Sequence, residues 1–512
     1  MGHVLMLLVT VVLASGIFLF LRRRAHKRGG LSLPPGPKGF PFLGNVNDMP
    51  KGDVLECHHW LKHKYLYGSI SSVTVLGQTF IIINDPDIAV ELLRDRSSNY
   101  SSRPGQIFSG EMIGWRHATA MSPYTSTWKI HRKNVQEAES IHLLLNLLES
   151  PDKLFDHIRK EAGSVILKMT YGYTTELHGN DPFVDLAAET MVQFAEATVP
   201  GRWMVDILPF LKYLPPWVPG MGSKQTANKM AIQLKQCTNQ PYEFVKQQMR
   251  EGRHTPSFLS QCIEDVGTAA EMEFIYKWAA LSLYLGGADT TVSSLMTFFL
   301  AMTLFPEVQG KAAEELNSII GSDRLPISTD RDQLPYIEAV MKETHRWHLV
   351  LPMCLPHTSI AEDTCRGYRI PKGAILLPNN WHFTHDPETY PDPMVFKPER
   401  HLDTPDHDSE PDPHKYVFGY GRRICPGRHV ADNALFITIA QCLTVFDIRK
   451  TTENGRVVEP KLEFEPGTIT HPVPFRCSIT AKSKAHEELV RAAEKDYPRE
   501  KSDAEELINI KW

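Results

Sequence analysis

Cysteines are few in this sequence and stand far apart. The chain has 512 residues and eight cysteines, none of which forms a CxxC pair. This density is too low for a disulfide scaffold, so we expect a reducing compartment. In that compartment the glycosylation sequon at Asn99 would stay unused.

A strong charge of either sign is also lacking, and the sequence contains no internal repeat. The formal net charge is -5, so nothing indicates a nucleic-acid partner. Hydrophobic residues make up 42% of the chain, which is normal for a globular protein. The length exceeds the usual single domain but suits a large enzyme of one compact body.

Long apolar runs are scarce, and the first lies at the N-terminus. From Val4 to Leu21 only Thr10 and Ser15 are polar, and these 18 residues would span about 27 Å as a helix. Basic residues follow at once, which keeps that flank cytosolic. We expect a single-pass anchor at 1–22 in the endoplasmic reticulum membrane, with the bulk of the protein in the cytosol and a basic, proline-rich linker at 23–45. A cleaved signal peptide is the alternative.

A second apolar run extends from Trp278 to Phe305. It is long enough to span a membrane, but Asp289 lies near its middle, where a charge is costly. A helix that is apolar on all sides is also typical of the centre of a large core. We therefore expect a buried core helix here.

The remaining patterns predict a mainly helical chain with short strands. Alternating apolar residues predict strands within 67–84, and turns at Gly367 and Gly373 frame strands within 366–378. The segment 385–415 is rich in Pro, Asp and His and reads as irregular. Amphipathic stretches predict helices at 152–171, 182–197 and 224–251. The last thirty residues, 483–512, are strongly charged, and we expect a solvated tail.

Cys425 is the most informative residue, because of the loop that surrounds it. The run from Phe418 to Gly427 holds one thiol among three glycines, one proline and two arginines. Glycines allow a close approach to a flat ligand, and guanidinium groups favour the thiolate. With no second ligand at metal-cage spacing, this cysteine suits one axial bond to a large cofactor. A helix should start just after Pro426 and point its amide groups at the sulfur.

This loop, Phe-x-x-Gly-x-Arg-x-Cys-x-Gly, resembles the haem-thiolate loop of the cytochrome P-450 superfamily, and the resemblance covers about residues 33–480. It implies a helical haem domain with small β-sheets and a minor β-rich N-terminal part, preceded by a transmembrane helix. The catalytic domain would occupy 46–482. It also implies haem b, with Cys425 as the axial ligand of the iron and Phe418, Gly421 and Gly427 as loop positions around it.

A second cluster, Gly286 to Thr290, resembles the oxygen-activation segment of this family. Small residues let dioxygen and substrate approach the helix backbone. The Thr290 hydroxyl can donate a hydrogen bond, and the Asp289 carboxylate can relay protons from solvent. The resemblance therefore implies that Asp289 and Thr290 are catalytic. A helix kink with back-bonded threonines is the alternative.

A third set of residues resembles the structural brace of the family. Glu343 and Arg346 are three residues apart and share a helix face, and Arg400 follows in Phe-Lys-Pro-Glu-Arg. We expect these three to form a buried network. At the next position the family more often has an aromatic residue, where this chain has His401.

The propionates of a haem need cationic or hydrogen-bond-donating partners. Arg423 matches the propionate arginine of the loop. Trp128 and Arg132, four residues apart, match the Trp-x-x-x-Arg helix of the family. His357 is a further candidate, although a lone histidine is more often a satisfied polar residue.

The resemblance implies a membrane-anchored monooxygenase that inserts one oxygen atom into an apolar small molecule, such as a terpenoid, polyketide or aromatic. Electrons would come from NADPH through a cytochrome P-450 reductase, with cytochrome b5 as an optional donor. The proline-rich block at 199–220 resembles fungal members that modify secondary metabolites. Segments 104–124, 200–220 and 468–472, together with Ala279 and Leu283, are expected to contact the substrate. A haem-thiolate isomerase or dehydratase and a haem sensor without turnover remain as alternatives.

Overall fold

A computed structural model of the chain describes residues 31–50, 54–104, 106–115, 118, 132–176, 179–199, 202–215, 222–266 and 270–510. The predicted anchor at 1–22 lies outside these residues. The chain divides into two compact units. The first holds the N-terminal part to Pro104, Met353–Asn379 and Tyr420–Arg422, and the second holds the rest.

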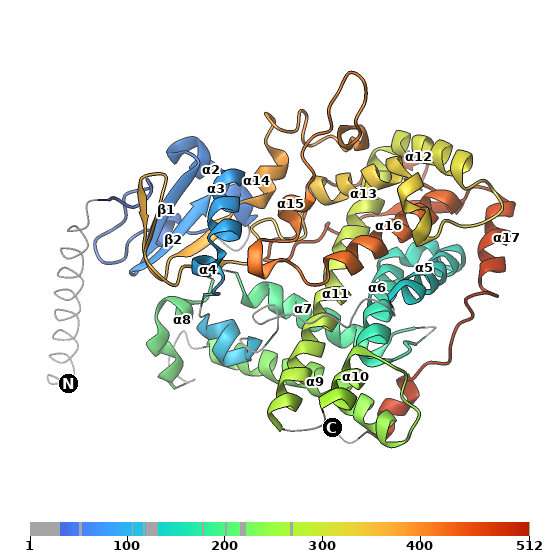
Figure 1. The fold of residues 1–512 in the computed structure, drawn as a ribbon, viewed down its shortest axis with the longest axis horizontal. Helices are drawn as coiled ribbons and strands as arrows, with labels where there is room; N and C mark the ends of the chain where they lie inside the picture. The colour runs from blue at the N-terminus through green and yellow to red at the C-terminus, as the bar shows by residue number, and fades with distance from the viewer. Residues whose placement is uncertain are drawn as a thin grey trace. The chain divides into compact units, whose positions relative to one another are not determined.

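The first unit is built on a four-stranded sheet of order β1-β2-β6-β3. β1 (Ile70–Val75) and β2 (Gln78–Ile83) form an antiparallel hairpin, whose turn at Leu76 and Gly77 has positive φ at both residues. β6 (Ile375–Pro378) pairs parallel with β2 and antiparallel with β3 (His357–Thr358). The strands predicted within 67–84 and 366–378 are thus confirmed (Figure 1).

The other elements of this unit are short apart from one helix. They are α2 (Glu56–Tyr67), α3 (Pro86–Ala89), α4 (Ser97–Tyr100), and the hairpin of β4 (Asp363–Cys365) and β5 (Tyr368–Ile370).

The second unit is mainly helical. Its longer helices are α5 (Arg132–Glu149), α6 (Leu154–Tyr171), α7 (Pro182–Ala197), α9 (Gly222–Arg250), α10 (Phe258–Val266), α11 (Ala270–Leu304), α12 (Pro306–Ile319), α13 (Pro335–Trp347), α16 (Arg428–Val445) and α17 (Lys484–Ala493). Short helices are α8 (Met204–Ile207), α14 (Asn380–His385) and α15 (His414–Val417). It also contains two antiparallel strand pairs: β7 (Phe446–Lys450) with β10 (Cys477–Ala481), and the short hairpin of β8 (Thr452–Glu453) with β9 (Arg456–Val457). The three helices predicted from amphipathic stretches are α6, α7 and α9.

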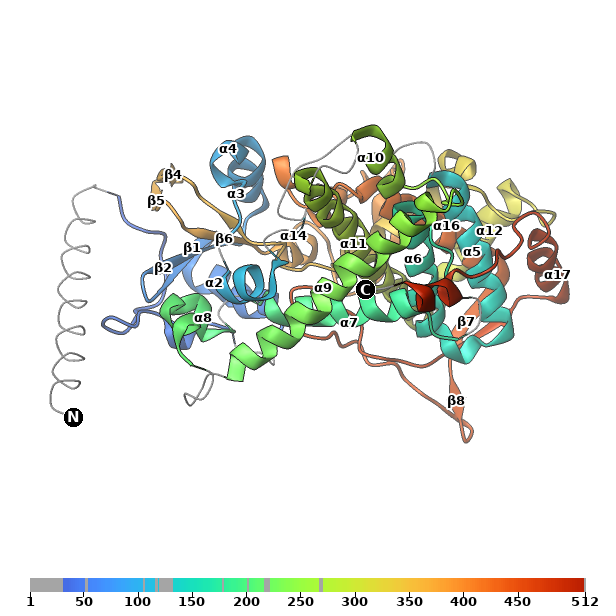
Figure 2. The same ribbon diagram turned by 90° about the horizontal axis from the view of Figure 1, so that it is seen from below.

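α11 is the central helix of this unit. It packs against α6, α7, α13 and α16, and Figure 2 shows α9 lying alongside α7. Leu295, Phe298 and Phe299 on α11 are fully buried and belong to the main hydrophobic core, which also takes in residues of α5, α13 and α16. The prediction of a buried core helix is therefore confirmed. No single helix among the described residues is long and apolar enough to cross a membrane. α11 and α12 have the required length and composition only as a pair, and this pair is bent by 103°.

The charged segment 483–512 was expected to be a solvated tail, but parts of it pack against the helical unit. Val490 of α17 is fully buried and belongs to the main core. Farther on, the Asp503 backbone N–H donates to the Thr174 carbonyl at 2.9 Å, and Asp503 Oδ2 accepts from the Thr174 N–H at 2.8 Å. Charge made this segment look solvated, but an amphipathic helix needs only one apolar side to pack.

Two neighbouring glycines at the middle of α11 have different surroundings. A Cβ on Gly287 would lie 2.8 Å from Ile166 Cγ1 of α6, which is closer than Cβ atoms approach in proteins. A Cβ on Gly286 would meet nothing within 4 Å. Gly287 thus lets α6 and α11 pack closely, whereas Gly286 borders open space.

This difference gives a matched pair of variants. We expect Gly287→Ala to lower the free energy of unfolding by about 1–3 kcal/mol, because the core must give way to the added methyl group. Gly286→Ala should stabilise the helix by up to about 1 kcal/mol, because alanine has the higher helix propensity. Denaturant unfolding measures both; an equal response of the two variants would contradict the packing role of Gly287.

Candidate active site

The loop that carries Cys425 closes on itself. The Cys425 backbone N–H donates to the Phe418 carbonyl at 2.7 Å, and α16 begins three residues later. A Cβ on Gly427 would lie 3.9 Å from Cys425 Sγ, so the sulfur sits against the start of this helix. The helix predicted to begin after Pro426 is thus present.

Burial and the helix start act on the Cys425 thiol in opposite directions. Burial raises the pKa of Cys425, while the backbone N–H groups of Gly427 and Arg428 and the Arg428 guanidinium lower it in part. The sequence indicates the two arginines before the cysteine as the source of positive charge. In the structure the charge that acts on the thiol is that of Arg428, the first residue of α16.

The other loop positions have distinct surroundings. Gly421 has a φ of 53°, and a Cβ there would lie 2.6 Å from the Leu93 carbonyl oxygen, so this glycine is required by packing within the first unit. Arg423 is half-buried, and burial lowers the pKa of its guanidinium, which favours an anionic partner. Phe418 stacks on His414, with ring centroids 5.5 Å apart, and meets His345 edge-on.

Midway along α11 the helix surface opens. Tyr284 and Val292 are buried, but Gly286 between them is exposed, and the following residues are partly exposed. Asp289 and Thr290 lie in this stretch. The Thr290 hydroxyl donates to the Gly286 carbonyl at 2.6 Å, which is the back-bonded arrangement. A hydroxyl has one proton, so Thr290 must rotate away from that carbonyl before it can donate elsewhere.

Asp289 is paired with a histidine that the sequence analysis did not identify. His471 Nε2 lies 3.1 Å from Asp289 Oδ1. Burial alone would lower the pKa of His471, but the Asp289 carboxylate outweighs it and holds that pKa above its ordinary value. The loop around His471 is fastened to α11, because Ser293 Oγ donates to the Thr470 carbonyl at 2.7 Å. Nothing in the sequence distinguishes His471 from the other histidines, since its partner lies 182 positions away.

Glu343, Arg346 and Arg400 meet in one buried network. Arg346 donates to both carboxylate oxygens of Glu343 at 2.8 Å, and Arg400 Nε donates to Oε1 at 3.1 Å. Burial alone would raise the pKa of Glu343, but Arg346 outweighs it and, with His401, lowers that pKa to about 2. The carboxylate is therefore charged at every physiological pH.

His401 belongs to the same network. Its Nε2 lies 2.9 Å from Glu343 Oε2, and its side chain is buried. The departure from the usual aromatic residue thus supplies a further partner to the carboxylate. The sequence alone shows that a histidine stands at this position, but not that it contacts Glu343.

The sequence predicts three further haem-binding residues, which are Trp128, Arg132 and His357. Trp128 lies outside the described residues. Arg132 is the first residue of α5, and its side chain is not described. His357 lies in β3 of the first unit, where its Nδ1 is 2.8 Å from the Tyr100 carbonyl oxygen. That bond uses one of the two ring nitrogens of His357, and its role toward a haem stays a prediction.

The described side chains fit a haem held by one thiolate. Cys425 is a free cysteine that lies at a helix start, where amide groups can donate to an anionic sulfur. In the same unit, the middle of α11 has an open surface at Gly286, with an acid and an alcohol beside it. One thiol, with no second soft ligand beside it in the described loop, provides one axial bond and no metal cage.

Comparison with known proteins agrees with this geometry. A sequence model described as cytochrome P-450 matches residues 34–479. The chain is 45% identical over 493 residues to the cytochrome P-450 monooxygenase claR of Ampulloclitocybe clavipes, covering 93% of this chain and 91% of the relative. It is 42% identical over 528 residues to the monooxygenase ppsD of Aspergillus oryzae, covering 99% and 100%. It is 38% identical over 510 residues to an O-methylsterigmatocystin oxidoreductase of Aspergillus flavus, covering 96% of each chain.

The chain belongs to the cytochrome P-450 family. Its fold of helices with small sheets is the one expected, and it is an oxidoreductase of the monooxygenase class. Membership also implies a haem iron held by a thiolate.

The buried network makes Glu343 a sensitive position. Glu343→Gln keeps the side-chain shape but leaves Arg346 buried without its counter-charge and Arg400 with Glu410 alone, which should cost about 3–5 kcal/mol of unfolding free energy. Glu487→Gln is the control, since Glu487 pairs with Arg491 at 2.9 Å on the exposed side of α17 and should change stability little. Denaturant unfolding of both variants measures the difference, and a small loss for Glu343→Gln would show that the network is not needed for stability.

Proposed function

We propose that this enzyme inserts one atom of dioxygen into an apolar small molecule, using a haem bound through Cys425 and electrons from NADPH delivered by a cytochrome P-450 reductase. One observation carries the proposal: a single thiol at the start of α16 and an acid–alcohol pair on the open stretch of α11 belong to the same helical unit. The bound haem would supply dioxygen activation, which consumes two protons and is aided by the thiolate.

Several residues would hold the cofactor. Cys425 would bind the iron, and the amide groups of Gly427 and Arg428 would stabilise the charge on its sulfur. Arg423 would bind a propionate, because its half-buried guanidinium favours an anion. Trp128 and Arg132 are proposed for the same role on the family pattern alone.

Proton transfer would use the side chains of Asp289, His471 and Thr290. The imidazole of His471 can pass a proton to the Asp289 carboxylate, since the two atoms are 3.1 Å apart and both side chains are partly exposed. Thr290 would donate from its hydroxyl after rotating away from the Gly286 carbonyl. These three side chains therefore connect solvent to the open middle of α11.

The proposed substrate is an apolar secondary metabolite. This rests first on the relatives, one of which is named for the oxidation of O-methylsterigmatocystin. It rests also on a contact between two of the segments expected to contact substrate, since Phe108 stacks on Trp203 with ring centroids 3.8 Å apart. The Thr198 hydroxyl, two residues before the second segment, lies 2.9 Å from the Thr468 hydroxyl of the third. Aromatic side chains near a site are typical of proteins that bind flat apolar ligands.

The cysteine assignment has a spectroscopic test. In the reduced, carbon-monoxide-bound form, the wild-type enzyme should show a Soret band at the thiolate position, and Cys425→Ala should lose it, because the proposed axial sulfur is removed. Cys442→Ala is the control: it removes a buried thiol from α16, the helix that follows the loop, and should keep the band. A thiolate band in Cys425→Ala would refute the assignment.

The proton pathway is tested by coupling. With reductase and NADPH, Thr290→Ala should release more hydrogen peroxide and reduce product per NADPH by about tenfold or more, because a positioned proton donor is lost. Thr291→Ala, one residue along the same helix, should couple as the wild type does. Unchanged coupling in Thr290→Ala would rule out its role.

The same assay separates the alternative activities. An isomerase or dehydratase would form product without consuming NADPH, and a sensor would form none.

A further inference from the structure

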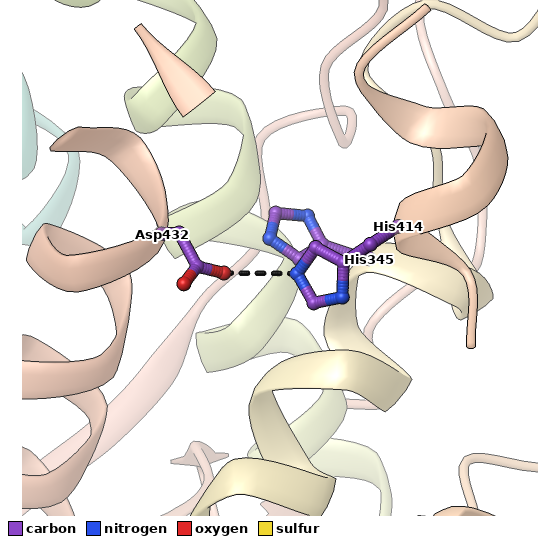
Figure 3. A group of neighbouring side chains, drawn as sticks. All are labelled: His345, His414 and Asp432. Carbon is purple, nitrogen blue, oxygen red and sulfur yellow. Dashed lines mark hydrogen bonds and ion pairs between the residues drawn. The ribbon is translucent and has the colours of Figure 1, made fainter. Parts of the chain in front are cut away.

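Two histidines and an aspartate gather beside the cysteine loop, and the proposed function does not use them. His345 lies on α13, His414 on α15 and Asp432 on α16. One potential ligand atom from each lies within 4.8 Å of the other two. In Figure 3 the carboxylate of Asp432 points at the ring of His414, against which the ring of His345 lies.

His414 is held from both sides by carboxylates. Its Nδ1 lies 2.6 Å from Asp412 Oδ1, and its Nε2 lies 2.8 Å from Asp432 Oδ1. A carboxylate on the far nitrogen is the arrangement that directs the other nitrogen of a histidine toward a metal ion and raises its basicity. Asp432 is fixed in turn, because its Oδ2 accepts from Arg331 at 2.7 Å.

His345 brings an unused lone pair. Its side chain is only 7% exposed, and its Nε2 has no hydrogen-bond partner among the described residues. Burial, together with the nearby charge of His414, lowers the pKa of His345 to about 3, so the imidazole is neutral. A buried polar atom without a partner is unfavourable, and a bound ligand would remove that cost.

We propose that His345, His414 and Asp432 bind a divalent transition-metal ion of the zinc type. Two neutral imidazoles and one carboxylate are a donor set that Zn²⁺ accepts, with a fourth position left for water. Metal–nitrogen bonds of about 2.0–2.1 Å require the ligand atoms to move closer than they are now. α13 contacts both α15 and α16, so changes in the side-chain torsions of the three residues would bring the ligand atoms closer.

A proton on His414 competes with a metal ion for this site. Burial alone would lower the pKa of His414, but Asp412 and Asp432 outweigh it and raise that pKa to about 9. Binding therefore releases one proton from His414 Nε2 to solvent as the metal–nitrogen bond forms. The other charged groups around the site are Arg331 on Asp432 and Lys342, whose Nζ lies 3.3 Å from Asp412 Oδ2.

The site adjoins the loop that carries the thiol. Both histidine rings pack on Phe418, whose carbonyl accepts from the Cys425 N–H. An ion at this place would fix the Phe418 end of the loop, which directly follows α15.

The test is a Zn²⁺ titration of the full-length, haem-loaded enzyme, so that the Cys425 thiolate is already occupied. Calorimetry and competition with a chromophoric chelator should show one ion per chain in the wild type. His345→Leu and His414→Arg should each weaken binding by about tenfold or more. The arginine in His414→Arg can still pair with both aspartates, so loss of binding there would not reflect loss of folding.

A surface histidine supplies the control. His254 pairs with Glu264 at 3.0 Å, and His254→Asn should bind as the wild type does. X-ray absorption at the zinc edge should show nitrogen and oxygen ligands only. If no stoichiometric binding occurs, if His345→Leu and His414→Arg bind as the wild type does, or if the edge shows sulfur, then the zinc is adventitious and the cluster is only a buried ion-pair network.

Discussion

The buried charge of Glu343 is the constraint on which the candidate site depends. The chain from 386 to 418 contains little regular structure, so hydrogen bonds to fixed groups must hold it. Arg346 provides them, since it pairs with Glu343 and also donates to the carbonyls of Pro393 and Val395. Arg400 joins the same carboxylate from within the segment. Because an unpaired charge cannot stay buried, these residues hold α13 and the approach to the cysteine loop together.

Residues of α13 contact two different parts of the helical unit. Glu343 faces the irregular segment, whereas His345, two residues later, faces α15 and the ring of Phe418. The cysteine loop is thus supported by one network of charges and by one cluster of aromatic and imidazole rings. If that cluster holds a metal ion, the same helix would carry both the structural brace and the ion site.

Neighbouring residues in the open stretch of α11 have different roles. Gly287 faces α6 and allows close packing, while Gly286 borders open space. Asp289 faces His471 and Thr290 turns its hydroxyl back to the helix. A single turn of helix therefore contains the residue that fixes its position and the residues that would act on bound oxygen.

Much of this protein could be read from its sequence. The loop around Cys425, the strands within 67–84 and the buried run at Trp278–Phe305 follow from local pattern, because backbone geometry and apolar burial depend on neighbouring residues. The spacing of Glu343 and Arg346 likewise placed both on one helix face.

Other contacts were decided only by the tertiary structure. The pairing of Asp289 with His471, the joining of His401 to Glu343 and the packing of Val490 into the core each connect residues far apart in sequence. No local pattern encodes such a contact, since a histidine or a charged helix has many possible partners. The sequence alone determined which chemical groups the site contains; the fold decided which of them touch, because only packing brings distant side chains within a few ångströms.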